Sequence, residues 1–161
     1  MRKILLLLAF VPIAAHAQQG TFTTKSMTPE TALSAARAAL EQCRKAGYQV
    51  AVAVVDRSGV PQVILRDRFA GSHTVGVAID KAWTAASFKI STATLAKETQ
   101  AGTPMSGLRS HARVLAIGGG LPIDGGGSHL GAIGVSGAPG GEADEACAAA
   151  GIKAIADSIE F

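Results

Sequence analysis

Three histidines and two cysteines carry the most distinctive side-chain chemistry of this 161-residue chain beyond its apolar N-terminal segment. The spacing of His73, His111 and His129 matches no zinc pattern such as His-Glu-x-x-His, and neither cysteine lies near a histidine in the sequence. We therefore expect no structural zinc site, and each histidine is judged in its own local context.

His73 is the most promising of the three because it lies in a polar loop, residues 66–74, directly before a predicted helix. An imidazole there could bind a metal ion or a haem iron, with Arg66 or Arg68 available for carboxylates. The alternative is a solvent-exposed histidine at a helix start.

The other two histidines have weaker contexts. His111 follows a loop and is expected to be exposed. It is a second candidate for cofactor binding, and the sequence does not decide whether it lies in the same site as His73. His129 heads a predicted strand and is expected to be a strand-edge residue.

Two further patterns do not support catalysis or nucleotide binding. Gly118–Gly120 and Gly125–Gly127 have neither the spacing nor the adjacent lysine of a phosphate-binding loop, and the second triplet is expected to form a tight turn between antiparallel strands. Ser136 lies in a Gly-Val-Ser-Gly-Ala sequence, which does not satisfy the G-x-S-x-G pattern of a serine nucleophile. No Lys/Arg cluster is interleaved with aromatic residues, so nucleic acid is not an expected partner.

Cys43 and Cys147 leave two alternatives open. Cys43 lies late on a predicted first helix and Cys147 lies early on a predicted last helix. If these helices pack antiparallel, a disulfide is geometrically feasible, and closing so long a loop would stabilise the fold by roughly 4–5 kcal/mol. The other alternative is two small buried thiols.

The N-terminal segment predicts export. A short basic start, an apolar run from Ile4 to Ala15 and the small-residue sequence Ala-His-Ala ending at Ala17 are typical of a cleaved signal peptide, too short to span a membrane. We expect a signal peptide at residues 1–17, a flexible leader at 18–27 and one domain at 28–161. The formal net charge is only +3, and two of the basic residues lie in the signal.

The helices and strands that position these side chains can be predicted from the sequence pattern. Thr28-Pro29-Glu30 starts a helix that runs to Lys45, and the β-branched run at 50–55 predicts a central strand covered on both faces. The turn at 56–59 and the run at 60–66 complete a hairpin.

The rest of the chain alternates between helix and strand. We expect helices from Ser72, at 92–99 and from Glu142, and strands at 114–117 and 129–136. In the helix from Ser72, Val75, Ile79, Ala82 and Ala86 form the predicted apolar face, and Asp80, Thr84 and Ser87 the polar one. This order predicts an α+β fold with an antiparallel sheet.

Four segments give the chain a family resemblance. Residues 81–88 (KAWTAASF), 118–123 (GGGLPI), 131–137 (GAIGVSG) and the alanine-rich stretch 144–152 resemble the GlcG/HbpS family, which groups haem-binding proteins with glycolate-operon accessory proteins. The resemblance implies a single α+β domain, a five-stranded antiparallel sheet flanked by helices, and a homo-oligomer.

The same resemblance implies a function. Some family members bind haem, and His73 resembles the histidine of an Ala-Gly-Pro-His-Thr sequence in exported members, with Ser72 replacing the proline. We expect an exported haem- or small-ligand-binding protein, in haem sensing, scavenging or protection against oxidative stress, with His73 as iron ligand and Arg66 or Arg68 at the propionates. The alternatives are an enzyme acting on a small organic molecule between helix and sheet, with His73 as acid–base group, and an accessory protein that contacts a sensor partner.

Overall fold

A computed structural model describes residues 20–160, so the predicted signal peptide lies outside the described residues. The elements are α1 (Pro29–Lys45), β1 (Ala51–Asp56), β2 (Pro61–Arg66), α2 (Thr74–Phe88), α3 (Thr92–Glu98), the 3-10 helix η1 (Ser106–Ser110), β3 (Gly120–Gly125), β4 (Ser128–Ser136), α4 (Gly141–Lys153) and α5 (Ala156–Ile159). Within the described part of the chain, no helix combines the length and apolar character needed to cross a membrane.

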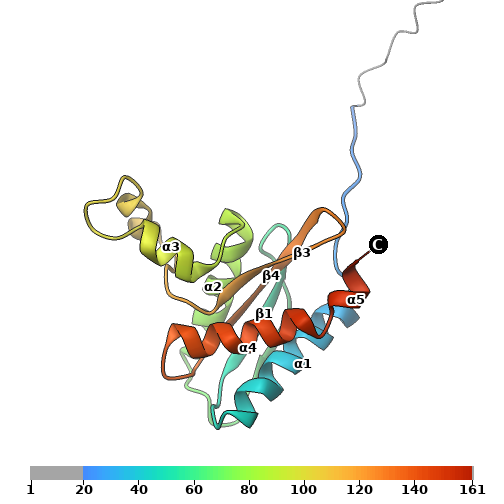
Figure 1. Cartoon of the computed structure of the whole chain (residues 1–161), viewed down its shortest axis with the longest axis horizontal. Helices are drawn as coiled ribbons and strands as arrows, with labels where there is room; N and C mark the ends of the chain where they lie inside the picture. Colours follow the sequence, from blue (N-terminus) through green and yellow to red (C-terminus); the bar gives the residue numbers. More distant parts are fainter. Residues whose placement is uncertain (1–19, 161) are drawn as a thin grey trace, which may run out of the picture.

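The four strands form one antiparallel sheet in the order β2-β1-β4-β3. Helices α1 and α4 cover one face of this sheet and α2 covers the other, while α3 stands out from the body (Figure 1). Val52 and Val54 of β1 are buried on the α1/α4 side, and Ala51 and Ala53 are buried on the α2 side. This confirms that the run at 50–55 is a central strand covered on both faces.

Helix α1 begins as its sequence predicts. The Thr28 hydroxyl accepts a hydrogen bond from the Thr31 N–H, and Pro29 occupies the first helical turn, where its missing N–H costs nothing. Met27, the last residue of the predicted leader, is buried in the core between α1 and the sheet. The fold therefore includes at least this end of the leader.

A disulfide joins α1 to α4. Cys43 and Cys147 are buried, their Cα atoms lie 5.5 Å apart, and no free cysteine remains among the described residues. The late part of α1 thus faces the early part of α4, as antiparallel packing requires, and the alternative of two buried thiols does not hold in this structure.

The sheet has four strands within residues 20–160, where five were expected. The predicted strand at 114–117 is a loop: the Val114 and Ile117 N–H groups donate to the nearby His111 and Leu115 carbonyls, and the Leu115 N–H donates to a side chain of α2. The buried Thr84 hydroxyl accepts from the Leu115 N–H and donates to the Arg113 carbonyl. Thr84 was predicted on the polar face of its helix, but its side chain is fully buried against this loop.

The strand that was not predicted is β3, which occupies part of the glycine-rich stretch. Gly126 and Gly127 then form the turn between β3 and β4 with φ of 52° and 71°. The expected tight turn at 125–127 is confirmed, and part of the glycine-rich stretch before it forms the strand β3.

Gly134 in β4 permits the close approach of α2, and we expect Gly134→Ala to destabilise the fold strongly. A Cβ at this position would lie 2.1 Å from the Ala78 carbonyl oxygen and 2.6 Å from the Ala82 nitrogen, both backbone atoms that cannot turn aside. Overpacking of this kind costs about 1–3 kcal/mol or more in free energy of unfolding, measurable by urea denaturation.

Gly76→Ala is the matched control. Gly76 lies in α2 with open space where a Cβ would stand, so alanine should raise stability by up to about 1 kcal/mol. Equal free energies of unfolding for Gly134→Ala and Gly76→Ala would show that α2 does not pack closely against Gly134.

Candidate functional site

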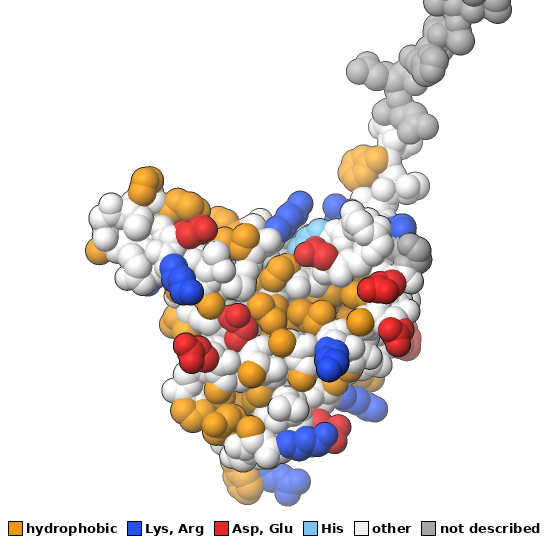
Figure 2. Space-filling view, in the orientation of Figure 1, with side chains coloured by type: hydrophobic (Ala, Val, Ile, Leu, Met, Phe, Trp, Pro, Cys, Tyr) orange, Lys and Arg blue, Asp and Glu red, His pale blue; other side chains and the backbone are white. Residues whose placement is uncertain are grey.

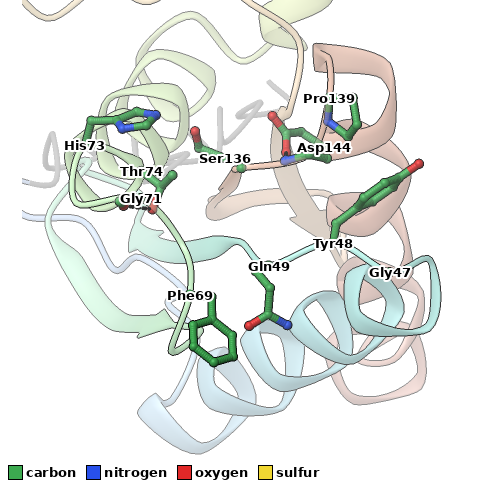
Figure 3. Close-up of a pocket in the computed structure, with 12 residues that line it drawn as sticks. Gly47, Tyr48, Gln49, Phe69, Gly71, His73, Thr74, Ser136, Pro139 and Asp144 are labelled. Carbon is green, nitrogen blue, oxygen red and sulfur yellow. Dashed lines mark hydrogen bonds between the residues drawn. The ribbon is translucent and has the colours of Figure 1, made fainter.

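A pocket of about 480 Å³ opens at one end of the sheet, where the ends of α1 and β4 meet the starts of α2 and α4 (Figure 3). We call it the His73 pocket. It is lined by Gly47, Tyr48, Gln49, Phe69, Gly71, His73, Thr74, Ser136, Gly137, Ala138, Pro139 and Asp144. Four separate segments of the chain therefore contribute to one site.

His73 stands on the rim of this pocket, immediately before α2. The Thr74 hydroxyl donates to the Gly71 carbonyl at 2.7 Å, which closes the turn that starts the helix. A Cβ on Gly71 would lie 2.7 Å from Cε1 and 2.9 Å from Nδ1 of His73, so the glycine leaves room for the imidazole. His73 is exposed, and Figure 3 shows its ring on the opposite side of the pocket from Asp144 and Pro139.

The loop before His73 is anchored to α1 by an ion pair. Asp67 is almost fully buried and accepts from Arg44, whose Nε lies 2.8 Å from Oδ1. The Asp67 N–H also donates to the Val50 carbonyl at the start of the sheet. The hydrogen bond to the Asp67 carboxylate raises the pKa of the Arg44 guanidinium above its ordinary value. The loop is thereby fixed at its first residue.

The opposite wall of the pocket is held by a buried ion pair between α2 and α4. Lys81 Nζ lies 2.7 Å from Asp144 Oδ2 and donates to the Val135 carbonyl at 3.0 Å. The second carboxylate oxygen of Asp144 accepts from the Ala138 N–H at 3.0 Å. Both oxygens of Asp144 are therefore engaged, and this residue shapes the site more than it offers a free carboxylate.

Other side chains give the His73 pocket a mixed chemistry. The Gln49 Oε1 atom is buried and has no hydrogen-bond partner within the described residues, so it could accept a hydrogen bond from a ligand. Phe69 is 79% exposed and presents an aromatic ring at the pocket edge. An imidazole, an amide, the Ser136 hydroxyl and an aromatic face thus surround one volume.

Only one of the four residues predicted for cofactor binding lines this pocket. Arg66 donates to the Ala70 carbonyl, and Arg68 is exposed outside the lining. His111 stacks on Trp83, with ring centroids 5.9 Å apart, and does not line the pocket that His73 lines. Within residues 20–160, no group of three or more metal-binding side chains is close enough to hold a metal ion.

Sequence reasoning missed Lys81 and Asp144 as a pair. A signal for Lys81 existed, because it follows Ala78 by three residues and precedes Ala85 by four, within the buried stripe of α2. A lysine in such a stripe needs a buried partner. Nothing in the sequence pattern points to Gln49 or Tyr48, since they lie in the connection after α1.

A sequence model of the family described as "Haem degrading protein HbpS-like" matches residues 27–153, most of the chain. The chain belongs to the HbpS-like family. The crystal structure of a double mutant of Streptomyces reticuli HbpS has 39% sequence identity and a TM-score of 0.79, covering 90% of this chain and 97% of that one. The resemblance to the GlcG/HbpS family and the single-domain α+β fold are thereby confirmed.

Two further relatives match the HbpS-like chain, and one of them is a longer protein. The structure of a PduOC–haem complex has 32% identity and a TM-score of 0.77, covering 81% of this chain and 96% of that one. The corrinoid adenosyltransferase PduO of Salmonella typhimurium is 35% identical over 103 residues, which are 63% of this chain and 31% of PduO. The chain therefore spans about a third of the length of this curated relative.

Proposed function

We propose that this chain is an exported haem-binding protein in which His73 would hold the iron. The observation that carries the proposal is an exposed imidazole on the rim of a pocket, with Gly71 leaving room for the ring. Membership of the HbpS-like family and the similarity to a PduOC–haem complex support it.

The residues of the His73 pocket fit the needs of a haem. An iron ligand with a free nitrogen is supplied by His73, and an apolar face for the macrocycle is supplied by the exposed ring of Phe69. The Tyr48 hydroxyl and the side-chain N–H groups of Gln49 can donate hydrogen bonds to the propionates. A haem held there would supply an iron centre, and His73 and Phe69 would set its orientation. Arg66 is engaged by Ala70 in this structure and is the weaker propionate partner.

Export and assembly complete the proposal. Export rests on the signal-like sequence at residues 1–17 and predicts a mature chain beginning at Gln18. Assembly into a homo-oligomer rests on the family resemblance and on exposed apolar side chains, Ile64 on the edge strand β2 and Phe69 at the pocket. Mass spectrometry of the exported protein and light scattering in solution test these two points.

We expect an optical titration with haemin to give a saturable Soret shift for the wild type and at least about tenfold weaker binding for His73→Ala, because an iron–nitrogen bond is lost. His111→Ala is the matched control, since His111 is also exposed but lies outside the pocket. Its titration should match that of the wild type. Equal affinities in all three proteins would remove His73 as the ligand, and no shift in any of them would remove haem.

The description of the family as haem-degrading favours a second candidate, in which bound haem is consumed. The same titration tests it when hydrogen peroxide is added. Faster loss of Soret absorbance with the wild type than with free haemin or with His73→Ala supports turnover. Protection of the absorbance supports storage or sensing.

A further inference from the structure

A second cavity, of about 380 Å³, lies at the opposite ends of β1 and β4 from the His73 pocket. We call it the His129 cavity. It is lined by Phe22, Thr23, Thr24, Lys25, Arg57, Lys89, Ser128 and His129. None of these lining residues is acidic, and three are permanently cationic. Lys and Arg side chains are visible along the upper edge of the body in Figure 2, near the point where the N-terminal segment joins it.

The placement of Lys89 in this cavity is unusual. Lys89 caps the C-terminus of α2 with φ of 56° and ψ of 32°, a left-handed conformation. It is the only non-glycine residue with positive φ within residues 20–160. Helices that end in this conformation usually have glycine there, because a Cβ is unfavourable. The helix dipole explains a cation in the last turn but does not explain a lysine at this particular position.

A β-bulge turns His129 toward the side of the sheet where α2 lies. Ile123 pairs with Gly131, but the next residue, Asp124, pairs with His129, so β4 contains one extra residue at Leu130. Leu130 joins the core on the α1/α4 side together with Ile123. Since neighbouring residues in a strand alternate between faces, Asp124 and its partner His129 lie on the other side. Without the bulge, His129 would lie on the α1/α4 side.

The imidazole of His129 has one nitrogen engaged and one without a hydrogen-bond partner in the described part of the chain. Nδ1 lies 2.8 Å from Asp124 Oδ1, and the side chain is only 8% exposed. Nε2 is buried and has no hydrogen-bond partner within residues 20–160. Buried polar atoms in folded proteins nearly always have a partner, so an orphan nitrogen on a residue that lines a cavity together with cations indicates a binding position. With Nδ1–H donating to Asp124, a protonated Nε2 would donate to an anion.

We propose that the His129 cavity binds a small phosphate-type oxyanion, either free phosphate or the phosphate group of a small metabolite. Arg57 and Lys89 would supply charge, and the imidazole of His129 and the hydroxyls of Thr23, Thr24 and Ser128 would supply hydrogen bonds. Donors that arrive from several directions suit a tetrahedral anion better than the planar fork of a carboxylate. This site is separate from the His73 pocket and does not depend on haem.

The decisive variant is Lys89→Gly, because glycine suits the backbone conformation and the fold should lose nothing. Isothermal titration of the haem-free protein with inorganic phosphate, at constant ionic strength in a buffer without phosphate, should show saturable binding. We expect Lys89→Gly to weaken it about tenfold through loss of a charge-assisted contact. Lys153→Ala removes an exposed cation at the end of α4, outside the cavity, and should bind like the wild type.

Several outcomes distinguish the sources of the anion. Binding of inorganic phosphate and of glycerol phosphate with similar affinity supports a phosphate group on a larger metabolite, and binding of inorganic phosphate alone supports the free ion. Tighter binding of succinate than of phosphate would overturn the phosphate assignment. Absence of saturable binding, or equal weakening by Lys89→Gly and Lys153→Ala, would overturn the site. A failed haemin titration would leave these results unaffected, because no haem is present.

Discussion

Reduction of the Cys43–Cys147 disulfide should lower the free energy of unfolding by about 4–5 kcal/mol, the largest single effect expected for this fold. The two cysteines are 104 residues apart, so the disulfide closes a loop that contains the whole sheet and α2. Such a long cross-link removes many conformations from the unfolded chain and thereby stabilises the folded one. A change of this size is a large part of the total stability of a small domain.

Urea denaturation with and without a phosphine reductant measures the effect. The control is the Cys43→Ala/Cys147→Ala double variant, which should be as unstable as the reduced wild type and insensitive to reductant. Alanine is preferred to serine there because both positions are buried. Two reactive thiols in the unfolded, non-reduced protein would contradict the disulfide, as would identical urea midpoints in oxidised and reduced protein.

Removal of one partner of the Lys81–Asp144 pair should have the next largest effect. Both side chains are almost fully buried, so Lys81→Met leaves a carboxylate in the interior without its counter-charge. Breaking a buried ion pair in this way typically costs about 3–5 kcal/mol in free energy of unfolding. The substitution should also disturb the His73 pocket, because Asp144 holds the Ala138 backbone at its wall.

A double variant separates the pair from simple packing. Lys81→Met/Asp144→Asn removes both charges and keeps an amide oxygen that can accept from Ala138. It should be more stable than Lys81→Met alone, because no buried charge remains unpaired. Urea denaturation of the wild type, Lys81→Met, Asp144→Asn and the double variant completes the double-mutant cycle. Additive losses from the two substitutions would show that the two groups do not stabilise each other.

Much of the fold follows from local patterns that need no tertiary information. Helix α1 is predictable because Thr28 and Pro29 start it and its apolar residues repeat at helical spacing. The strand β1 is predictable because a run of buried β-branched residues suits a strand covered on both faces. These elements stood close to their predicted bounds, since their backbone hydrogen bonds are made within or beside them.

The strand predictions were wrong where contacts with residues distant in the sequence decide the backbone conformation. Residues 114–117 resemble a strand, but the Leu115 N–H donates to the Thr84 hydroxyl of α2, and the segment is a loop. The glycine-rich stretch resembles a series of turns, yet it contains β3 because Gly120 and its neighbours pack closely against α2 and β4. The strand propensity of a segment does not indicate which distant residues will pack against it or bond to it.

By itself, the sequence determined the α+β class, the main helices and the central strand, because these depend on periodicity and on end signals within a few residues. It also singled out His73, whose loop and helix start are contiguous in the chain. Only the tertiary structure decided that His73 faces Gln49, Ser136 and Asp144, and that Arg66 and His111 point elsewhere. A pocket is formed by segments that meet through the packing of helices on a sheet, and their meeting depends on buried contacts such as Lys81–Asp144 that leave little trace in local spacing.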